Sequence, residues 1–422
     1  MEYTVTRSTG FFSRLGSSFG GIILGLVLFV AGSGLLWWNE GDFVKTRDAL
    51  NEARGEAEEL VDLSRVDASL DGRLVHATGL ADTRDVLRDP EFGLGGRGIA
   101  FERRVEFYQW TENSRTEKRQ TLGGGEETVT TYSYARKWVG YPVDSNAFHA
   151  PEARSVHANN VLLKVDSLTR RAVNVSFGAY RLPPFLVAGI GGRQPFAVSL
   201  DPAVRERLSR QLLRAWRGTG GAVGNWWDIG GGGLRHAGTP QLVHESGNCL
   251  YLGASPATPE VGDVRLTFNM TPPARISLIA RAKGDTFEAF RASNGKEVSA
   301  LSMGDVSMDA MFAEEHSDNV FMTWVVRIFG TVLVVAGLRL VMAPLVVIAS
   351  IIPLLGSIVG AGTGLVSLLL GLAWSLCLMA VAWLRFRPAI GGIMLAVAAG
   401  FLLLLYAKGR ARTVTPQTSG IR

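Results

Sequence analysis

An uncharged run near the start of the chain, residues 19–38, limits the possible fold more than any other feature. At about 1.5 Å per residue, a helix of this length covers a hydrocarbon core of about 30 Å. The run closes with Trp37 and Trp38, a residue type that collects at the headgroup layer of membranes. We therefore predict a first transmembrane helix at residues 19–38, after which the chain enters an aqueous domain.

A cleaved signal peptide is the alternative interpretation of this run. Signal peptides have an apolar core of about 7–15 residues and end at a cleavage site made of small residues. The run in this chain is longer and ends at two tryptophans. We therefore favour a span that stays in the protein.

Apolar runs of this length are missing between residues 39 and 318 and return near the C-terminus. The three further spans that we predict are residues 321–343, 358–384 and 388–406. Residues 344–356 are also apolar, but they are too few for an easy crossing and are broken by Pro353. This pattern favours an interfacial or re-entrant segment, with a fifth helix as the alternative, and gives four transmembrane helices in all.

Basic residues flank the first and last spans, and they predict the orientation of the chain. These residues are Arg7, Arg14, Lys408, Arg410 and Arg412. Because Lys and Arg are enriched on the cytoplasmic side, we predict a cytoplasmic N-terminus (residues 1–18), a cytoplasmic tail (407–422) and an extracytoplasmic domain at 39–318. Arg385 and Arg387 would lie outside, against this rule. A five-helix chain would place them inside but would leave the more basic tail outside.

Residues 39–318 are rich in alternating apolar and polar positions and in β-branched and aromatic residues, with Gly, Pro, Asn and Asp at the turns. This pattern is typical of strands. One helix is predicted near residues 201–217, where Asp201 can cap the first turn and Gly218 can end it. The predicted fold class is therefore a multi-spanning α-helical membrane protein with a large, mainly β (α+β) extracytoplasmic domain between the first and second helices.

The chain carries few patterns that indicate chemistry. The six histidines form no metal-ligand spacing, and the glycines of residues 93–98 lack the strand-to-helix context of a dinucleotide site. His244, Glu245 and Cys249 lie close in sequence, but alternating strand positions explain them better than a thiol–histidine pair does. Cys249 and Cys377 fall in different compartments and predict no disulfide. We predict no catalytic, cofactor-binding or metal-binding residue, and hence no enzyme.

The overall charge of +5 is mild and is carried mostly by arginine. No basic stripe interleaved with aromatic residues is present, so we predict no nucleic-acid partner. A composition rich in Gly and Arg and poor in Lys is typical of bacteria with GC-rich genomes, which predicts a location in a bacterial inner membrane.

The later predicted spans contain no Asp, Glu or His, which argues against proton-coupled transport and intramembrane proteolysis. Arg327 and Arg339 lie near opposite ends of the second span, and we predict that each reaches its membrane interface, as Trp37 and Trp38 do. Small residues recur at a spacing of four, which favours close packing of helices within one chain or between copies. The predicted packing residues are Gly21, Gly25, Gly360, Gly364, Gly392, Ala396 and Gly400.

Several short motifs occur in one order along the chain. They include Asn39-Glu40-Gly41 after the first span, "RRVEFYQWTE" with Tyr108, Gln109 and Trp110, and "PEVGDVRLTF" with Gly262 and Asp263. In these motifs the chain resembles the LUMA family, also called the transmembrane protein 43 family. The resemblance implies four spans, a luminal domain between the first two, and both termini in the cytosol or nucleoplasm. Asp42 stands where animal members tend to have Arg, and the animal members' nuclear-envelope partners do not carry over to a bacterium.

The functional hypothesis from the sequence is a non-enzymatic integral membrane protein that self-associates as a scaffold and organises or senses the membrane envelope. The expected partners are membrane lipids, further copies of the chain and other membrane proteins. In this hypothesis Glu40 makes a structural hinge contact near the membrane. A channel or lipid-handling pore formed by the C-terminal helices is the alternative, and the resemblance permits it. An exported hydrolase is a third and weaker hypothesis.

Overall fold

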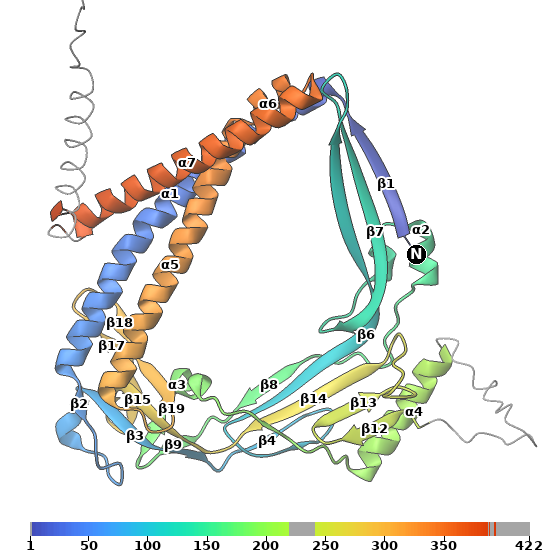
Figure 1. Cartoon of the computed structure of the whole chain (residues 1–422). Helices are drawn as coiled ribbons and strands as arrows, with labels where there is room; N and C mark the ends of the chain where they lie inside the picture. Colours follow the sequence, from blue (N-terminus) through green and yellow to red (C-terminus); the bar gives the residue numbers. More distant parts are fainter. Residues whose placement is uncertain (1, 219–240, 387, 389–391, 394–422) are drawn as a thin grey trace, which may run out of the picture.

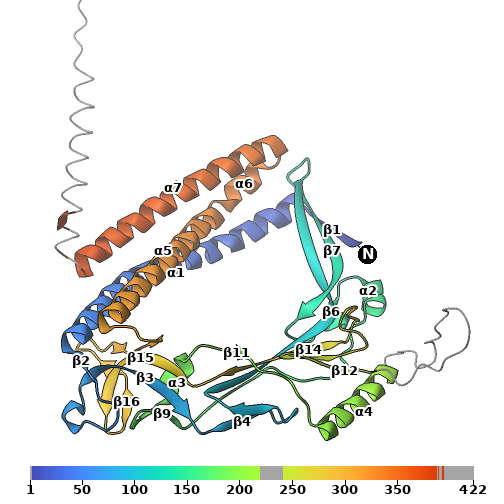
Figure 2. The ribbon, with the colours of Figure 1, turned by 60° about the horizontal axis from the view of Figure 1, so that its bottom comes forward.

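The computed structural model describes residues 2–218, 241–386, 388, 392 and 393 of the chain. Three parts form the edges of a triangle (Figure 1). Long helices make one edge, a β-rich base makes the second, and a ribbon of three strands makes the third. The view turned toward the base shows the same arrangement (Figure 2). The β-rich region lies between the first and second long helices, as predicted.

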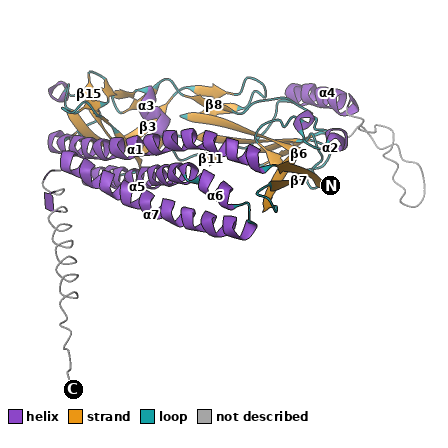
Figure 3. Cartoon of the chain, turned by 90° about the horizontal axis from the view of Figure 1, so that it is seen from above, coloured by secondary structure: helices purple, strands orange, loops and turns teal. Residues whose placement is uncertain are grey.

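Three long helices make up the helical edge, and a short helix joins two of them. They are α1 (Phe11–Glu56), α5 (Met308–Val341), α6 (Ala343–Ala349) and α7 (Pro353–Phe386). Seen from above, α1, α5 and α7 form a layer beside the strands (Figure 3). Among the described residues, these three are long and apolar enough to cross a membrane. The predicted fourth span, residues 388–406, lies almost wholly outside the described residues.

Glycines set the close approach of α1 and α5. A Cβ on Gly25 would lie 2.7 Å from the carbonyl oxygen of Gly337, and a Cβ on Gly32 would lie 2.8 Å from that of Gly330. Both pairs are seven residues apart, so they repeat along one seam of two antiparallel helices. Gly371 plays the same part for α7, where a Cβ would lie 2.5 Å from the Val335 side chain of α5.

The other predicted packing residues lie farther from neighbouring helices than Gly25 does. A Cβ on Gly360 would lie 3.4 Å from Val346 of α6, whereas Gly21, Gly364 and Gly392 have no described atom within 4 Å. Ala396 and Gly400 lie outside the described residues. The seam between α1 and α5 therefore uses a spacing of seven residues and not the predicted spacing of four.

The helix α1 continues past Trp38, so residues 39–56 of the predicted β-rich domain are helical, while the predicted end of the membrane span at residue 38 stays a prediction. It continues to Glu56 because the base holds its second half. Ala49, Leu50 and Ala53 are buried in a cluster with Met311 and Phe312 of α5. The turn between β17 (Phe290–Arg291) and β18 (Glu297–Val298) adds polar contacts. There Ser293 N donates to Glu52 Oε1 (2.8 Å) and Asn294 Nδ2 donates to Lys45 O (2.7 Å).

The base contains two main sheets. The larger has the order β1-β7-β6-β14-β13-β12, with β8 and β11 at its edges. Its strands are β1 (Glu2–Thr9), β6 (Ala100–Gln120), β7 (Glu126–Val139), β8 (Leu168–Arg171), β11 (Gln194–Pro195), β12 (Val243–Ser246), β13 (Cys249–Leu252) and β14 (Val264–Thr271). The helix α4 (Pro202–Gly218) packs on it through Leu208 and Leu212, and Ala203 N donates to the capping Asp201 carboxylate at 2.9 Å.

The smaller sheet has the order β10-β9-β3-β15-β16, with β2 and β19 alongside. Its strands are β2 (Glu58–Glu59), β3 (Leu74–Thr83), β9 (Val175–Phe177), β10 (Tyr180–Leu182), β15 (Ala274–Lys283), β16 (Thr286–Glu288) and β19 (Ala300–Met303). The strands β4 (Val86–Arg88) and β5 (Gly95–Arg97) form a separate pair. The short helices are α2 (Pro151–Val156) and α3 (Pro184–Gly189).

The ribbon consists of the outer parts of β6 and β7 with β1 at the edge. β1 pairs with residues 126–133 of β7 along its whole length. Paired strands lie about 4.8 Å apart. The predicted cytoplasmic N-terminus and a strand of the predicted extracytoplasmic domain therefore share a sheet, and in this conformation a bilayer does not separate them. This differs from the prediction for residues 1–18.

The ribbon tip closes the triangle by binding the far end of the helices. Arg14 of α1 donates from Nη1 to the Gly124 carbonyl (2.6 Å) and to the Ser350 hydroxyl (3.1 Å), and its Nη2 lies 3.4 Å from Glu126. Gly123 N donates to the Ile351 carbonyl at 3.2 Å. Residues 344–356, predicted to be interfacial or re-entrant, form α6, a turn and the start of α7, and they contact this tip.

The pairing of β1 with β7 can be tested by crosslinking. Thr4 and Thr131 are register partners whose Oγ1 atoms lie 3.5 Å apart. In a background with Cys249→Ser and Cys377→Ser, we expect Thr4→Cys with Thr131→Cys to form a disulfide in oxidised membranes, measured by gel mobility. Thr4→Cys with Thr128→Cys is the control, since three residues of offset separate the thiols by about 10 Å. Equal yields for both pairs would contradict the register.

The glycine seam predicts a second outcome. Gly25→Leu must push α1 away from the α5 backbone, so we expect a loss of about 1–3 kcal/mol in the free energy of unfolding. Gly34→Leu is the matched control, because Gly34 of α1 has no atom of the described structure within 4 Å. The measurement is the midpoint of heat unfolding in mild detergent. A control that unfolds as early as Gly25→Leu would argue against the seam.

Candidate functional site

The best-defined polar site in the helical layer lies where α1, α5 and α7 meet near the base. It is built around Asn39, Glu40 and Gly41 of α1, in the middle of the continuous helix. All three residues are buried. Each contacts a neighbouring helix, so the motif joins three helices.

Glu40 is the centre of this junction, with only 1% of its surface exposed. Arg327 of α5 donates to both of its carboxylate oxygens, from Nε at 2.6 Å and from Nη2 at 2.8 Å. Trp383 of α7 donates from Nε1 to Oε2 at 2.6 Å. A bidentate Arg–carboxylate pair with a third donor satisfies most of the hydrogen-bonding capacity of the carboxylate.

Arg327 is held by aromatic rings as well as by charge. Its guanidinium carbon lies 4.9 Å from the centroid of the Trp324 ring and 5.7 Å from that of the Trp383 ring. Its side chain is 11% exposed. Arg327 therefore points toward the Glu40 carboxylate of α1, and its predicted place at the membrane interface stays a prediction.

Asn39 and Gly41 complete the junction. Asn39 Nδ2 donates to the Thr323 carbonyl of α5 at 3.2 Å. A Cβ on Gly41 would lie 2.8 Å from the Phe386 ring, so only glycine lets α7 come this close. The next residue, Asp42, pairs with Lys296 of the base at 2.7 Å. The four consecutive residues therefore contact α5, α7 and the base in turn.

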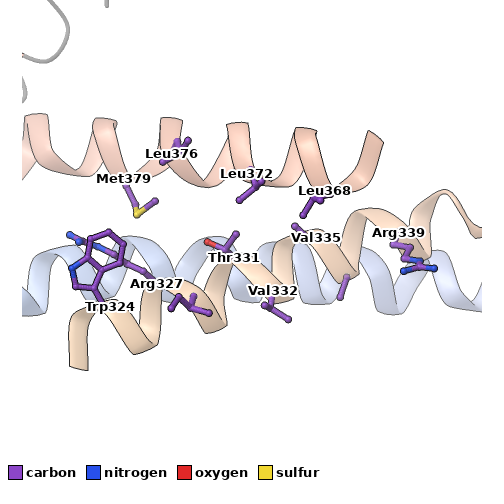
Figure 4. Close-up of a pocket in the computed structure, with 12 residues that line it drawn as sticks. Trp324, Arg327, Thr331, Val332, Val335, Arg339, Leu368, Leu372, Leu376 and Met379 are labelled. Atoms are coloured by element: carbon purple, nitrogen blue, oxygen red, sulfur yellow. The ribbon is translucent and has the colours of Figure 1, made fainter. Parts of the chain in front are cut away.

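The remaining predicted interface residues lie on the outside of the layer. Trp37 is 39% exposed and its ring centroid lies 5.8 Å from that of Phe386, while Trp38 is 58% exposed. Arg339 is exposed and forms no hydrogen bond or ion pair within the described part of the chain. It lines a groove between α5 and α7 that Arg327 also lines, at the opposite end (Figure 4).

The family motif with Gly262 and Asp263 lies in the base, beside β14 of the larger sheet. Asp263 accepts hydrogen bonds from the Tyr251 hydroxyl and from the Glu260 backbone N–H at 2.8 Å. Burial raises the pKa of Asp263 above its usual value, since it disfavours the charged form. Gly262 has a φ of 107°, which favours glycine, and its N–H donates to the Tyr108 carbonyl at 2.9 Å.

The neighbouring family residues also have structural contacts. Gln109 is buried and donates to the Asn160 carbonyl (3.2 Å), while its Oε1 accepts from the Val143 N–H (2.6 Å). The Trp110 ring stacks on His157 with centroids 4.0 Å apart. Gln109 and Trp110 thus fix the loop 143–160 against the root of the ribbon, and Gly262 and Asp263 fix β14 beside it.

The sequence candidates for chemistry are not brought together. Cys249 pairs across the strands with Ser246, and His244 pairs with Tyr251. Burial raises the pKa of the Cys249 thiol, which disfavours a reactive thiolate. Glu245 instead binds Arg205 of α4 at 2.7 Å. Within the described residues, no group of three or more His, Cys, Asp or Glu side chains could hold a metal ion.

Sequence reasoning missed the pair of Glu40 and Arg327, and it missed the roles of Trp383 and Phe386. A signal for the pair was present, since Glu40 directly follows one apolar run and Arg327 lies just inside the next. Two antiparallel helices joined by one domain place these residues at the same depth. Opposite charges at one depth in a bilayer are expected to pair.

The junction predicts a double-mutant cycle. Glu40→Leu leaves Arg327 without its counter-charge among apolar side chains, and Arg327→Met does the same to Glu40, so we expect each to lose about 3–5 kcal/mol in stability. The double variant Glu40→Leu with Arg327→Met removes both charges, and we expect it to lose less than the two single losses added together. Heat unfolding in detergent measures each term, with Arg339→Gln as the control on the same helix. Additive losses would show that the two charges do not interact.

Comparison with known proteins agrees with these motifs. A family model described as Transmembrane protein 43 matches residues 107–388. Transmembrane protein 43 of Rattus norvegicus is 26% identical over 92% of this chain and 90% of that protein, and the human protein is 26% identical over the same shares. The Drosophila melanogaster homolog is 26% identical over 88% of this chain and 90% of its own length. No solved structure matches. The chain therefore belongs to the transmembrane protein 43 family and is an integral membrane protein.

Proposed function

We propose that the chain is a non-enzymatic, self-associating scaffold that organises or senses the membrane envelope through its β-rich domain. The support is the contrast between two edges of the triangle. The helical edge is apolar and suits lipid, whereas the ribbon edge is polar on both faces. If a single copy placed its helical edge in the hydrocarbon of a bilayer, its polar ribbon edge would be exposed to the same hydrocarbon.

The ribbon extends from the base to the far end of the helices, so it covers the same distance from the base as their apolar segments do. Its root lies in the base, at the opposite end of the base from the second half of α1 (Figure 1), and its tip binds Arg14 at the other end of the apolar run. Residues 113–120 of β6 are exposed and include Arg115, Glu117, Lys118 and Arg119. Charged side chains and open strand edges are not tolerated in hydrocarbon.

Association of several copies would resolve this conflict. Copies that turn their helices toward lipid and their ribbons toward one another would keep the ribbons in water or in protein contacts. The glycines of the outer helix faces leave room for such contacts. Gly20 and Gly21 of α1 and Gly364 of α7 have no described atom within 4 Å of an added Cβ. The expected occupants of these faces are lipids, further copies or other membrane proteins.

The second candidate is a channel or lipid-handling pore. The polar ribbon supports the channel form, because ribbons gathered in one assembly would line a water-filled space. The apolar groove between α5 and α7 supports the lipid form. Purified protein that carries neither ions nor lipids across liposome membranes would contradict this candidate and leave the scaffold proposal standing.

The membrane that holds the protein is also part of the proposal. The relatives compared above come from animals, and the bacterial inner membrane inferred from composition stays a prediction. The relatives' name describes a transmembrane protein and no enzyme activity. The absence of catalysis is likewise a proposal, consistent with the raised pKa of Cys249.

Self-association is tested by the mass of the protein in lipid nanodiscs. We expect two or more copies per particle, and fewer copies when Gly21→Leu and Gly364→Leu fill the open faces. The control is Gly55→Leu, since Gly55 is equally open but lies beyond the apolar run. A protein that is strictly monomeric in nanodiscs and in crosslinked native membranes would refute the scaffold.

A further inference from the structure

The groove between α5 and α7 has the shape and position of a site for an acyl chain. It has a volume of about 560 Å³, within the usual range of about 300–1,000 Å³ for small-molecule sites. Leu368, Leu372, Leu376 and Met379 of α7 form one wall, and α5 forms the other (Figure 4). Its walls are apolar over most of their length, so a hydrocarbon chain suits it.

Two arginines define the length of the groove. Arg327 and Arg339 are twelve residues apart on α5. At about 1.5 Å per residue, this spacing is about 18 Å, close to the depth of one leaflet of a core about 30 Å thick. A chain of one leaflet therefore fits between the level of Arg339 and the middle of the layer.

The two arginines differ in charge compensation. Arg327 is neutralised by the two hydrogen bonds that it donates to Glu40. Arg339 has no ion pair or hydrogen bond with any residue in the described ranges, and its side chain is exposed. The charges therefore cancel at the Glu40 end of the groove. At the other end Arg339 carries a positive charge that no described residue compensates.

A second cavity, of about 570 Å³, continues from the cationic end. It shares Ala336 and Arg339 with the groove and is also lined by Arg14, Lys118 and Glu126. Glu126 lies 3.4 Å from Arg14 and 3.1 Å from Lys118, so the cavity is lined by one carboxylate and three cations, of which the third is Arg339. The excess of positive charge suits an anion that enters beside Arg339.

We propose that the two cavities form one site for an anionic glycerophospholipid of the bilayer. An acyl chain fills the groove, and the phosphate lies between Arg339, Arg14 and Lys118. Arginine binds phosphate through paired hydrogen bonds, which are stronger than those between neutral groups. A lipid whose headgroup also carries an amine is disfavoured, because its positive charge meets the same three cations.

The site also gives the lipid a structural effect. Arg14 and Lys118 belong to the N-terminal end of α1 and to the ribbon tip, whereas Arg339 belongs to α5. A phosphate among them links the tip to the helices and adds to the contact that Arg14 makes with Gly124. This inference does not rest on self-association, since every residue of the site comes from one chain.

The test is lipid binding to the full chain in mild detergent, with native mass spectrometry as the readout. The probes are dioleoylphosphatidylglycerol and dioleoylphosphatidylcholine, which differ only in the headgroup. We expect the anionic lipid to bind at least tenfold more tightly, and we expect Arg339→Gln to remove about tenfold of its affinity, as for the loss of one charge-assisted contact. Arg385→Gln, an exposed arginine of α7 outside the groove, is the control.

A second variant, Leu372→Trp, tests the contribution of the acyl chain separately from that of the headgroup, because the larger side chain fills the groove. We expect Leu372→Trp to lower the affinity for the anionic lipid. Inorganic phosphate alone should bind tightly to neither the wild type nor the variant. If Arg339→Gln fails to fold, judged by its heat unfolding without lipid, Lys118→Gln takes its place with a smaller expected loss. Equal binding of both lipids, equal losses in Arg339→Gln and Arg385→Gln, or full binding to Leu372→Trp would each overturn the proposal.

Discussion

The ion pair between Glu40 and Arg327 is the interaction on which the rest of the helical layer depends. A charge within an apolar layer is costly unless its partner lies at the same depth. The pair therefore sets the sliding position of α1 against α5, and the Trp383 hydrogen bond sets α7 against both. The glycines Gly25 and Gly32 then meet Gly337 and Gly330, a match that one turn of slippage would destroy.

With the helices fixed at one end, the ribbon can fasten them at the other. A 46-residue helix and a 21-residue strand both span about 70 Å, so α1 and β6 have matching lengths. The helix α1 ends in the base and β6 starts there, so both elements run between the base and the ribbon tip, where Arg14 binds. The helical layer is thus held to the β-rich domain at two distant points, through the Asp42–Lys296 pair beside the Glu40 junction and through Arg14 and Gly124 at the ribbon tip.

The sequence predicts the parts of this structure that depend on local pattern. Apolar runs predict α1, α5 and α7, and alternation predicts the β-rich region between the first two. The parts that it does not predict depend on contacts between distant residues. Arg327 lies 287 residues from Glu40, so its partner is not visible in its own segment. The strand β1 is not visible in its own sequence, because its hydrogen-bonding partner β7 lies more than 100 residues further along the chain. α1 continues past Trp38 because Ala49, Leu50 and Ala53 find a buried cluster in the folded chain.

The two arginines of α5 show how position decides the role of one residue type. Sequence alone gives Arg327 and Arg339 the same role, an interface contact at each end of a span. In the folded chain Arg327 faces the Glu40 carboxylate of α1, and the indole rings of Trp324 of α5 and Trp383 of α7 lie against its guanidinium. Arg339 faces the groove and the ribbon tip, where the described cations outnumber the carboxylates. The first arginine therefore serves the register of the helices. The second keeps its charge available to an outside anion, which in a bilayer is most readily the phosphate of a lipid.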